Sequence, residues 1–123
     1  MIVRHLIDVE PHEWGNGTSR RFLTARDGMG YTLTDTVVRA GTQSRLEYRN
    51  HLEACYCIAG SGFLMDAEGN KHAITPGTMY ALDQHDAHYL IASPIEDLRL
   101  VCVFTPALEG HEVHDLTRDF SHY

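Results

Sequence analysis

The 123-residue sequence contains no stretch that approaches the roughly 20 consecutive apolar residues of a membrane-spanning helix. Its opening segment, residues 1–7, has an apolar run too short for the core of a secretory signal peptide. Basic residues form no run either: the ten Lys and Arg are scattered, and the formal net charge is -7. Because this negative charge repels phosphate backbones, we expect no binding to nucleic acid. Because the sequence shows neither a signal peptide nor a membrane-spanning segment, we expect a cytoplasmic protein that does not bind a membrane.

Helical periodicity is also scarce. The best helical candidate, residues 6–13, contains Pro11 and amounts to a turn or two at most. Turn signals rich in Gly, Pro and Asn recur at short intervals instead, and the runs between them are rich in Thr, Val, Tyr, Ile and Leu. We predict strands at residues 20–25, 31–39, 43–48, 54–59, 62–66, 71–74, 78–82, 88–92 and 98–104. These strands favour one all-β domain, a barrel or jelly roll, over residues 1–123.

Cysteine is infrequent and its count is odd. Cys55, Cys57 and Cys102 predict buried free thiols in a reducing compartment rather than a disulfide framework. Cys55 and Cys57 lie two positions apart on a predicted strand and therefore share a face. The pair could contribute to a soft-metal site, but it lacks the two further ligands that zinc requires. We interpret all three cysteines as core residues.

Two segments resemble the paired motifs of the cupin barrels. Residues 76–88 form a turn, a strand and a histidine-bearing loop, as in the second cupin motif. Residues 50–62 form a strand that carries a carboxylate and ends in a Gly-Ser-Gly turn, as in the first motif. The resemblance implies a single cupin (jelly-roll) barrel with little helix and with a metal site.

Most of the chain is similar to one cupin family, the ectoine synthases. The resembling segments are residues 1–4, 27–30, 50–54, 56–58, 80–86, 102–104 and 112–115. The resemblance implies a hydro-lyase that cyclises N-γ-acetyl-L-2,4-diaminobutyrate to the compatible solute ectoine, with elimination of water. It also implies a homodimer that pairs through exposed strand edges.

The metal ligands implied by the resemblance are Glu53, Tyr80 and His88. It implies iron(II) as the divalent ion, with zinc or another first-row ion as a substitute. Carboxylate and phenolate oxygens favour a hard ion, whereas the imidazole keeps the first-row transition metals in contention. His85 is the competing candidate for the imidazole ligand.

The substrate residues are also implied by the resemblance. Its substrate-binding positions are Trp14, Arg21, Thr34, Thr36, Tyr48, Phe104, Glu112 and His114. Tyr48, Glu112 and His114 are in addition the catalytic candidates, and Arg21 can pair with a substrate carboxylate. Glu112 and His114 share a face if their segment is extended. Residues 106–123 are polar, and we expect them to form a tail that closes over or near the barrel mouth.

The first cupin motif departs from the usual pattern, because Arg45 and Glu47 stand where cupins commonly carry a His-x-His pair. Either residue could change the charge of the pocket and the choice of substrate. Two alternatives therefore stay open. One is a non-catalytic cupin that binds another small acid through Arg45 and Glu47. The other is a cupin cyclase or hydrolase that acts on a related acylated diamino acid.

Overall fold

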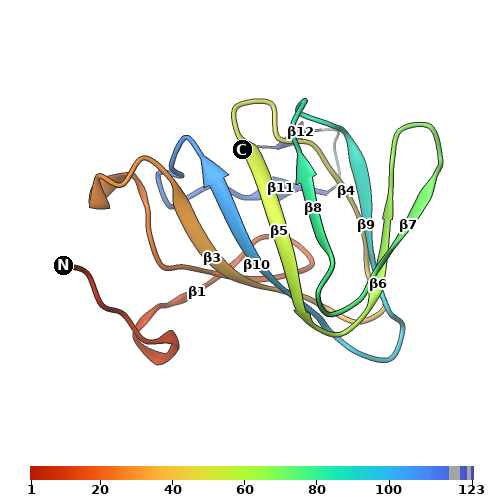
Figure 1. Ribbon diagram of the computed structural model, residues 1–123, viewed down its shortest axis with the longest axis horizontal. Coiled ribbons are helices and arrows are strands. Elements are labelled where there is room, and N and C mark those ends of the chain that lie inside the picture. Colours follow the sequence, from red (N-terminus) through yellow and green to blue (C-terminus); the bar gives the residue numbers. More distant parts are fainter. Residues whose placement is uncertain (117–119, 122) are drawn as a thin grey trace.

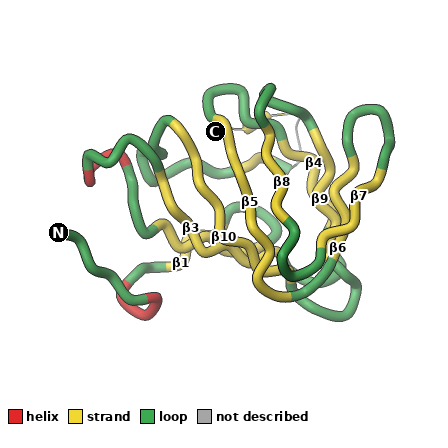
Figure 2. The backbone as a smooth tube through the Cα atoms, viewed as in Figure 1, coloured by secondary structure: helices red, strands yellow, loops and turns green. Residues whose placement is uncertain are grey.

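The computed structural model describes residues 1–116, 120, 121 and 123. These residues fold into two antiparallel sheets and a short hairpin, with very little helix (Figures 1 and 2). The strand order is β1-β2-β3-β10-β5-β8 in the larger sheet and β4-β9-β6-β7 in the smaller one. Non-consecutive neighbours such as β3 and β10 bring distant parts of the chain side by side, as Figure 1 shows.

The elements are short. The larger sheet contains β1 (Pro11–Glu13), β2 (Gly17–Arg21), β3 (Thr32–Val38), β5 (Leu52–Ala59), β8 (Met79–Leu82) and β10 (Leu98–Thr105). The smaller sheet contains β4 (Gln43–Leu46), β6 (Gly62–Met65), β7 (Lys71–Ile74) and β9 (His88–Ala92). The hairpin pairs β11 (His114–Asp115) with β12 (Phe120–Ser121), and two 3-10 turns are η1 (Leu6–Asp8) and η2 (Ala25–Asp27). No helix among the described residues is long and apolar enough to cross a bilayer.

The strand predictions fail mainly at the N-terminal end. Residues 20–25 are not one strand, because β2 ends at Arg21 and η2 begins at Ala25. The Asp27 carboxylate accepts a hydrogen bond from the backbone N–H of Thr24 at 2.9 Å, and this local partner turns the chain away from the sheet. Residues 6–13 contain only the single turn η1, followed by β1, a strand that the sequence does not predict.

The core lies on the inner faces of the strands. In β10, Leu98, Leu100, Cys102 and Phe104 are buried, while the residues between them are partly or fully exposed. This alternation is the period of two that an extended strand imposes. All three cysteines are free and buried, as predicted. The inner faces of β5 and β10 therefore supply both the packing and the polar groups of the site.

Candidate active site

A small cavity of about 30 Å³ lies against the inner faces of the strands. The predicted site residues that line it are Trp14, Thr36, Tyr48, Glu53, Tyr80, Phe104 and His114. Arg21, Thr34, His88 and Glu112 do not line it. Cys55, Cys102 and Tyr123 also line the cavity, although the sequence does not predict them as site residues.

Glu53 is the acidic group of the cavity. It lies on β5 and is only 6% exposed. Burial raises the pKa of its carboxyl to about 8, although hydrogen bonding to Cys55, Tyr48 and Cys102 acts in the opposite direction. None of the groups that act on this carboxyl within the described part of the chain is a cation, and a bound metal ion would supply the compensating positive charge.

Tyr48 lies beside this carboxyl group. Burial first, and then the negative charge of Glu53, raise the pKa of Tyr48 well above its ordinary value. Tyr48 therefore stays a neutral phenol, which can donate a hydrogen bond. The ring of Tyr48 packs edge-on against Phe104, with 5.5 Å between the ring centres.

His88 has the geometry of a metal-binding histidine. Its Nδ1 lies 2.9 Å from the carbonyl oxygen of Asp86, while its Nε2 is buried without a hydrogen-bond partner among the described residues. A carbonyl oxygen only accepts, so Nδ1 carries the proton and Nε2 presents a lone pair. Burial lowers the pKa of His88 and keeps the imidazole neutral. Neutral imidazole, with its other nitrogen bound to a carbonyl, is the form that ligates metals.

The three predicted metal ligands come from different strands: Glu53 from β5, Tyr80 from β8 and His88 from β9. Tyr80, on β8, is directly opposite Cys55 on β5 and lines the cavity with Glu53. His88 does not line the cavity; the centre of its ring lies 5.9 Å from that of Tyr48, which does. By donor type, a carboxylate, a phenol and an imidazole suit a divalent first-row ion, although only Glu53 and Tyr80 of the three line the cavity.

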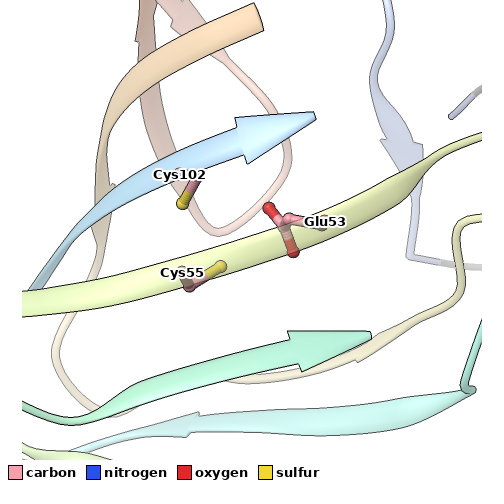
Figure 3. Close-up of side chains that lie close together, drawn as sticks. All are labelled: Glu53, Cys55 and Cys102. Carbon is pink, nitrogen blue, oxygen red and sulfur yellow. The ribbon is translucent and has the colours of Figure 1, made fainter. Parts of the chain in front are cut away.

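A second group of possible metal ligands overlaps with the first. Glu53, Cys55 and Cys102 each offer one ligand atom, and these atoms all lie within 4.8 Å of one another (Figure 3). His88 does not belong to this group. The structure therefore contains a possible metal-binding cluster in which Glu53 is accompanied by two thiols.

His85, the competing ligand candidate, is engaged elsewhere. Its Nδ1 lies 2.7 Å from the carbonyl oxygen of Tyr48 and 3.1 Å from that of His51. These contacts tie the loop before β9 to the segment before β5. His85 does not line the cavity.

Glu112 is held by a loop rather than by the cavity. Its carboxylate accepts hydrogen bonds from the backbone N–H groups of Glu109 at 2.8 Å and Gly110 at 2.9 Å. Nη1 of Arg21 lies 3.7 Å from the same carboxylate. Burial by itself raises the pKa of Glu112, but the N–H donors and the charge of Arg21 outweigh it, so the pKa lies below its ordinary value. This loop leads directly to His114.

Aromatic side chains close the cavity. The ring of Tyr123 is stacked on His114, with 4.4 Å between the ring centres and an angle of 12° between the planes. It also lies 5.1 Å from Tyr48 and 5.4 Å from Phe104, and Tyr123 is 3% exposed. The rings of His114 and Trp14 are nearly perpendicular, with 5.8 Å between their centres. No spacing signal identifies Tyr123, because it lies beyond a polar segment; only tertiary packing brings it here.

Trp14 reaches the cavity because the chain turns tightly after it. A Cβ at Gly17 would collide with the carbonyl oxygen of Val37, so glycine is required where β2 passes β3. The indole Nε1 of Trp14 donates a hydrogen bond to that same carbonyl at 3.2 Å. The indole therefore lines the same cavity as Thr36, the residue before Val37 on β3.

The remaining polar candidates lie outside the cavity. The hydroxyl of Thr34 hydrogen-bonds to that of Thr36 at 2.9 Å, and only Thr36 lines the cavity. Nη2 of Arg45 lies 3.5 Å from Oε1 of Glu47, and neither residue lines the cavity. The prediction that residues 106–123 close the mouth falls partly on residues 117–119 and 122, outside the described residues.

The two antiparallel sheets, with a cavity enclosed against their inner faces, define a cupin. The same fold occurs in the polyketide cyclase RemF from Streptomyces resistomycificus, with a TM-score of 0.74 and 20% identity over 85% of this chain and 79% of that one. A family model described as ectoine synthase matches residues 1–121, and the chain belongs to that family.

The relatives agree with this assignment. The L-ectoine synthase of Desulfatibacillum aliphaticivorans is 51% identical over 122 residues, which cover 94% of this chain and 92% of the relative. The crystal structure of ectoine synthase from P. lautus has a TM-score of 0.85 and 46% identity, covering 89% of this chain and 81% of that chain. The fold class and the family inferred from the sequence are confirmed.

Proposed function

We propose that this protein is a hydro-lyase that forms ectoine from N-γ-acetyl-L-2,4-diaminobutyrate. The observation that carries the proposal is membership of the ectoine synthase family over residues 1–121, with 51% identity to an L-ectoine synthase. The reaction joins the substrate's α-amine nitrogen to its acetamide carbon and expels the carbonyl oxygen as water.

Glu53, Tyr80 and His88 would hold a divalent ion, for which we propose iron(II). The unpaired Nε2 of His88 and the buried Glu53 carboxyl support this assignment. When bound, such an ion supplies Lewis acidity toward a carbonyl oxygen. A carboxylate, a phenol and an imidazole together suit a first-row transition metal better than a soft ion.

The aromatic residues around the cavity would fold the substrate and exclude water. Ring closure of a flexible chain gains much of its rate from holding the amine and the carbonyl about 3 to 3.5 Å apart. Trp14, Tyr48, Phe104 and His114 line one enclosure, which supports this role. We assign Thr36 and Thr34 to the polar side of the same binding region, and we assign Arg21 to the substrate carboxylate.

Three side chains are assigned to proton handling. Tyr48, kept as a phenol by its raised pKa, would donate to the oxygen that leaves as water. His114 would take a proton from the attacking amine. Glu112 fixes the loop before His114 through its backbone contacts, so we assign it to the same proton-handling group.

We also infer a homodimer in a reducing compartment, the cytoplasm. Large apolar side chains are exposed on β5, β8 and β10 of the larger sheet: Leu52, Tyr56, Ile58, Met79 and Val103. An exposed apolar face of this kind supports pairing with a second copy. The three free cysteines support a reducing compartment.

The decisive experiment is turnover by the purified protein. We expect iron(II)-loaded protein, handled without oxygen, to convert the acetylated diaminobutyrate to ectoine, detected by proton NMR. Protein stripped with a chelator should be much slower. Stabilisation by the substrate without any product would favour the non-catalytic binding alternative. Conversion of other acylated diamino acids, but not of this one, would favour the related cyclase or hydrolase.

A further inference from the structure

Two thiols and a carboxylate meet on neighbouring strands of the larger sheet. Cys55 and Cys102 are directly opposite each other in the pairing of β5 with β10. Glu53 precedes Cys55 by two residues and shares its inward face. Glu53 is 6% exposed, and each cysteine is 2% exposed. Figure 3 shows the side chains of Glu53 and Cys55 from β5 and of Cys102 from β10 lying close together.

The spacing of this group suits a tetrahedral ion. Ligand atoms bound to zinc at about 2.0 to 2.3 Å lie roughly 3.3 to 3.8 Å from one another. The three ligand atoms here lie within 4.8 Å of one another, so side-chain rotation can close the difference of about 1 Å. Tyr80, directly opposite Cys55 on β8, has its phenol within hydrogen-bonding reach of the Cys55 thiol.

The chemistry of this group differs from that of the oxygen-rich ligand set. Thiolates select zinc and softer ions, whereas carboxylate and phenolate oxygens favour harder ones. We propose that Glu53, Cys55 and Cys102 form a sulfur-lined metal site for a thiophilic divalent ion, of the class of zinc or cadmium. Because Glu53 is a member of both groups, occupation of the sulfur-lined site excludes an ion held by Glu53, Tyr80 and His88.

Cadmium chloride titrated into metal-free protein provides the test, since sulfur-to-cadmium charge transfer absorbs in the ultraviolet. We expect the wild-type band to saturate at one equivalent. Cys55→Ser or Cys102→Ser should lose about half of it, because one of the two sulfur ligands is removed. Cys57→Ser is the matched control, because Cys57 is also buried on β5 but lies outside the group. The cadmium-loaded Cys57→Ser variant should therefore keep the full absorption band. His88→Ala should also keep the band.

Three results would overturn the proposal: no band in the wild type, a full band in both cysteine variants, or loss of the band in His88→Ala. Cys55→Ala and Cys102→Ala, checked by circular dichroism, serve where a serine variant does not fold. A separate measurement tests whether an ion in the sulfur-lined site excludes iron from Glu53, Tyr80 and His88: the iron content of the protein after cadmium loading. We expect bound iron to fall in the wild type and to be retained in Cys102→Ala. The absorption needs no substrate, so a failure to form ectoine leaves this test intact.

Discussion

Arg21 donates a hydrogen bond from Nη2 to the hydroxyl oxygen of Tyr123 at 2.6 Å, although 102 positions separate the two residues. The same guanidinium donates to the carbonyl oxygens of Gly110 at 2.8 Å and Glu112 at 2.6 Å. Its Nε is buried without a partner among the described residues. Arg21 therefore holds Tyr123, which lines the cavity, and the loop that carries Gly110 and Glu112 in place.

Removing the Tyr123 hydroxyl should weaken substrate binding. Tyr123→Phe keeps the ring on His114 but deprives Arg21 of one acceptor, so Arg21 is held less firmly. A hydrogen bond contributes about 1 kcal/mol, which corresponds to a rise of roughly fivefold in KM. We expect kcat to change less. Steady-state kinetics of ectoine formation measure both constants.

Tyr123→Ala tests the aromatic wall in the same assay. This variant removes the ring that stacks on His114 and packs against Phe104, so KM should rise further than in Tyr123→Phe. The exposed Tyr31→Phe is a matched control for loss of a tyrosine hydroxyl and should behave as the wild type. A lower KM in Tyr123→Ala would show that Tyr123 obstructs the cavity instead of enclosing the substrate.

Replacing His88 should reduce metal retention, whereas replacing His85 should not. Nε2 of His88 has no hydrogen-bond partner in the described part of the chain, while Nδ1 of His85 is already in contact with two backbone carbonyls. We expect His88→Ala to bind iron(II) at least about tenfold more weakly, since even outer partners of metal ligands contribute this much. Metal analysis of desalted protein gives the measurement. Equal iron loss in His85→Ala would contradict the assignment of His88.

The Glu112 carboxylate should make stability depend on pH in the acid range. The pKa of Glu112 in the folded protein is lowered from an ordinary value of 4.5. The contribution of this carboxylate to the free energy of unfolding is therefore fully present above pH 4.5 and is lost as pH falls through the folded pKa. Glu112→Gln should therefore lower the melting temperature at neutral pH. The difference from the wild type should shrink as pH falls below about 4.5. Thermal melts from pH 7 to 3 test this; a constant difference would contradict it.

The local pattern determined much of the architecture. Runs of β-branched and aromatic residues between turn signals placed most strands, and residues 71–74 and 88–92 coincide with β7 and β9. A period of two placed Cys55 and Cys57 on one inner face, because successive side chains of a strand point to opposite sides. The cupin motifs, with Glu53 and Tyr80, are local as well, and both residues line the cavity.

The partners across the strands were decided only by the tertiary structure. Spacing assigns a face to Cys55 but does not select Cys102 as its opposite neighbour; the register of β5 against β10 does. Packing likewise brought Tyr123 onto His114 and to Arg21. The physical reason is that alternation is local to one strand, whereas strand register and loop packing depend on the burial of the whole core.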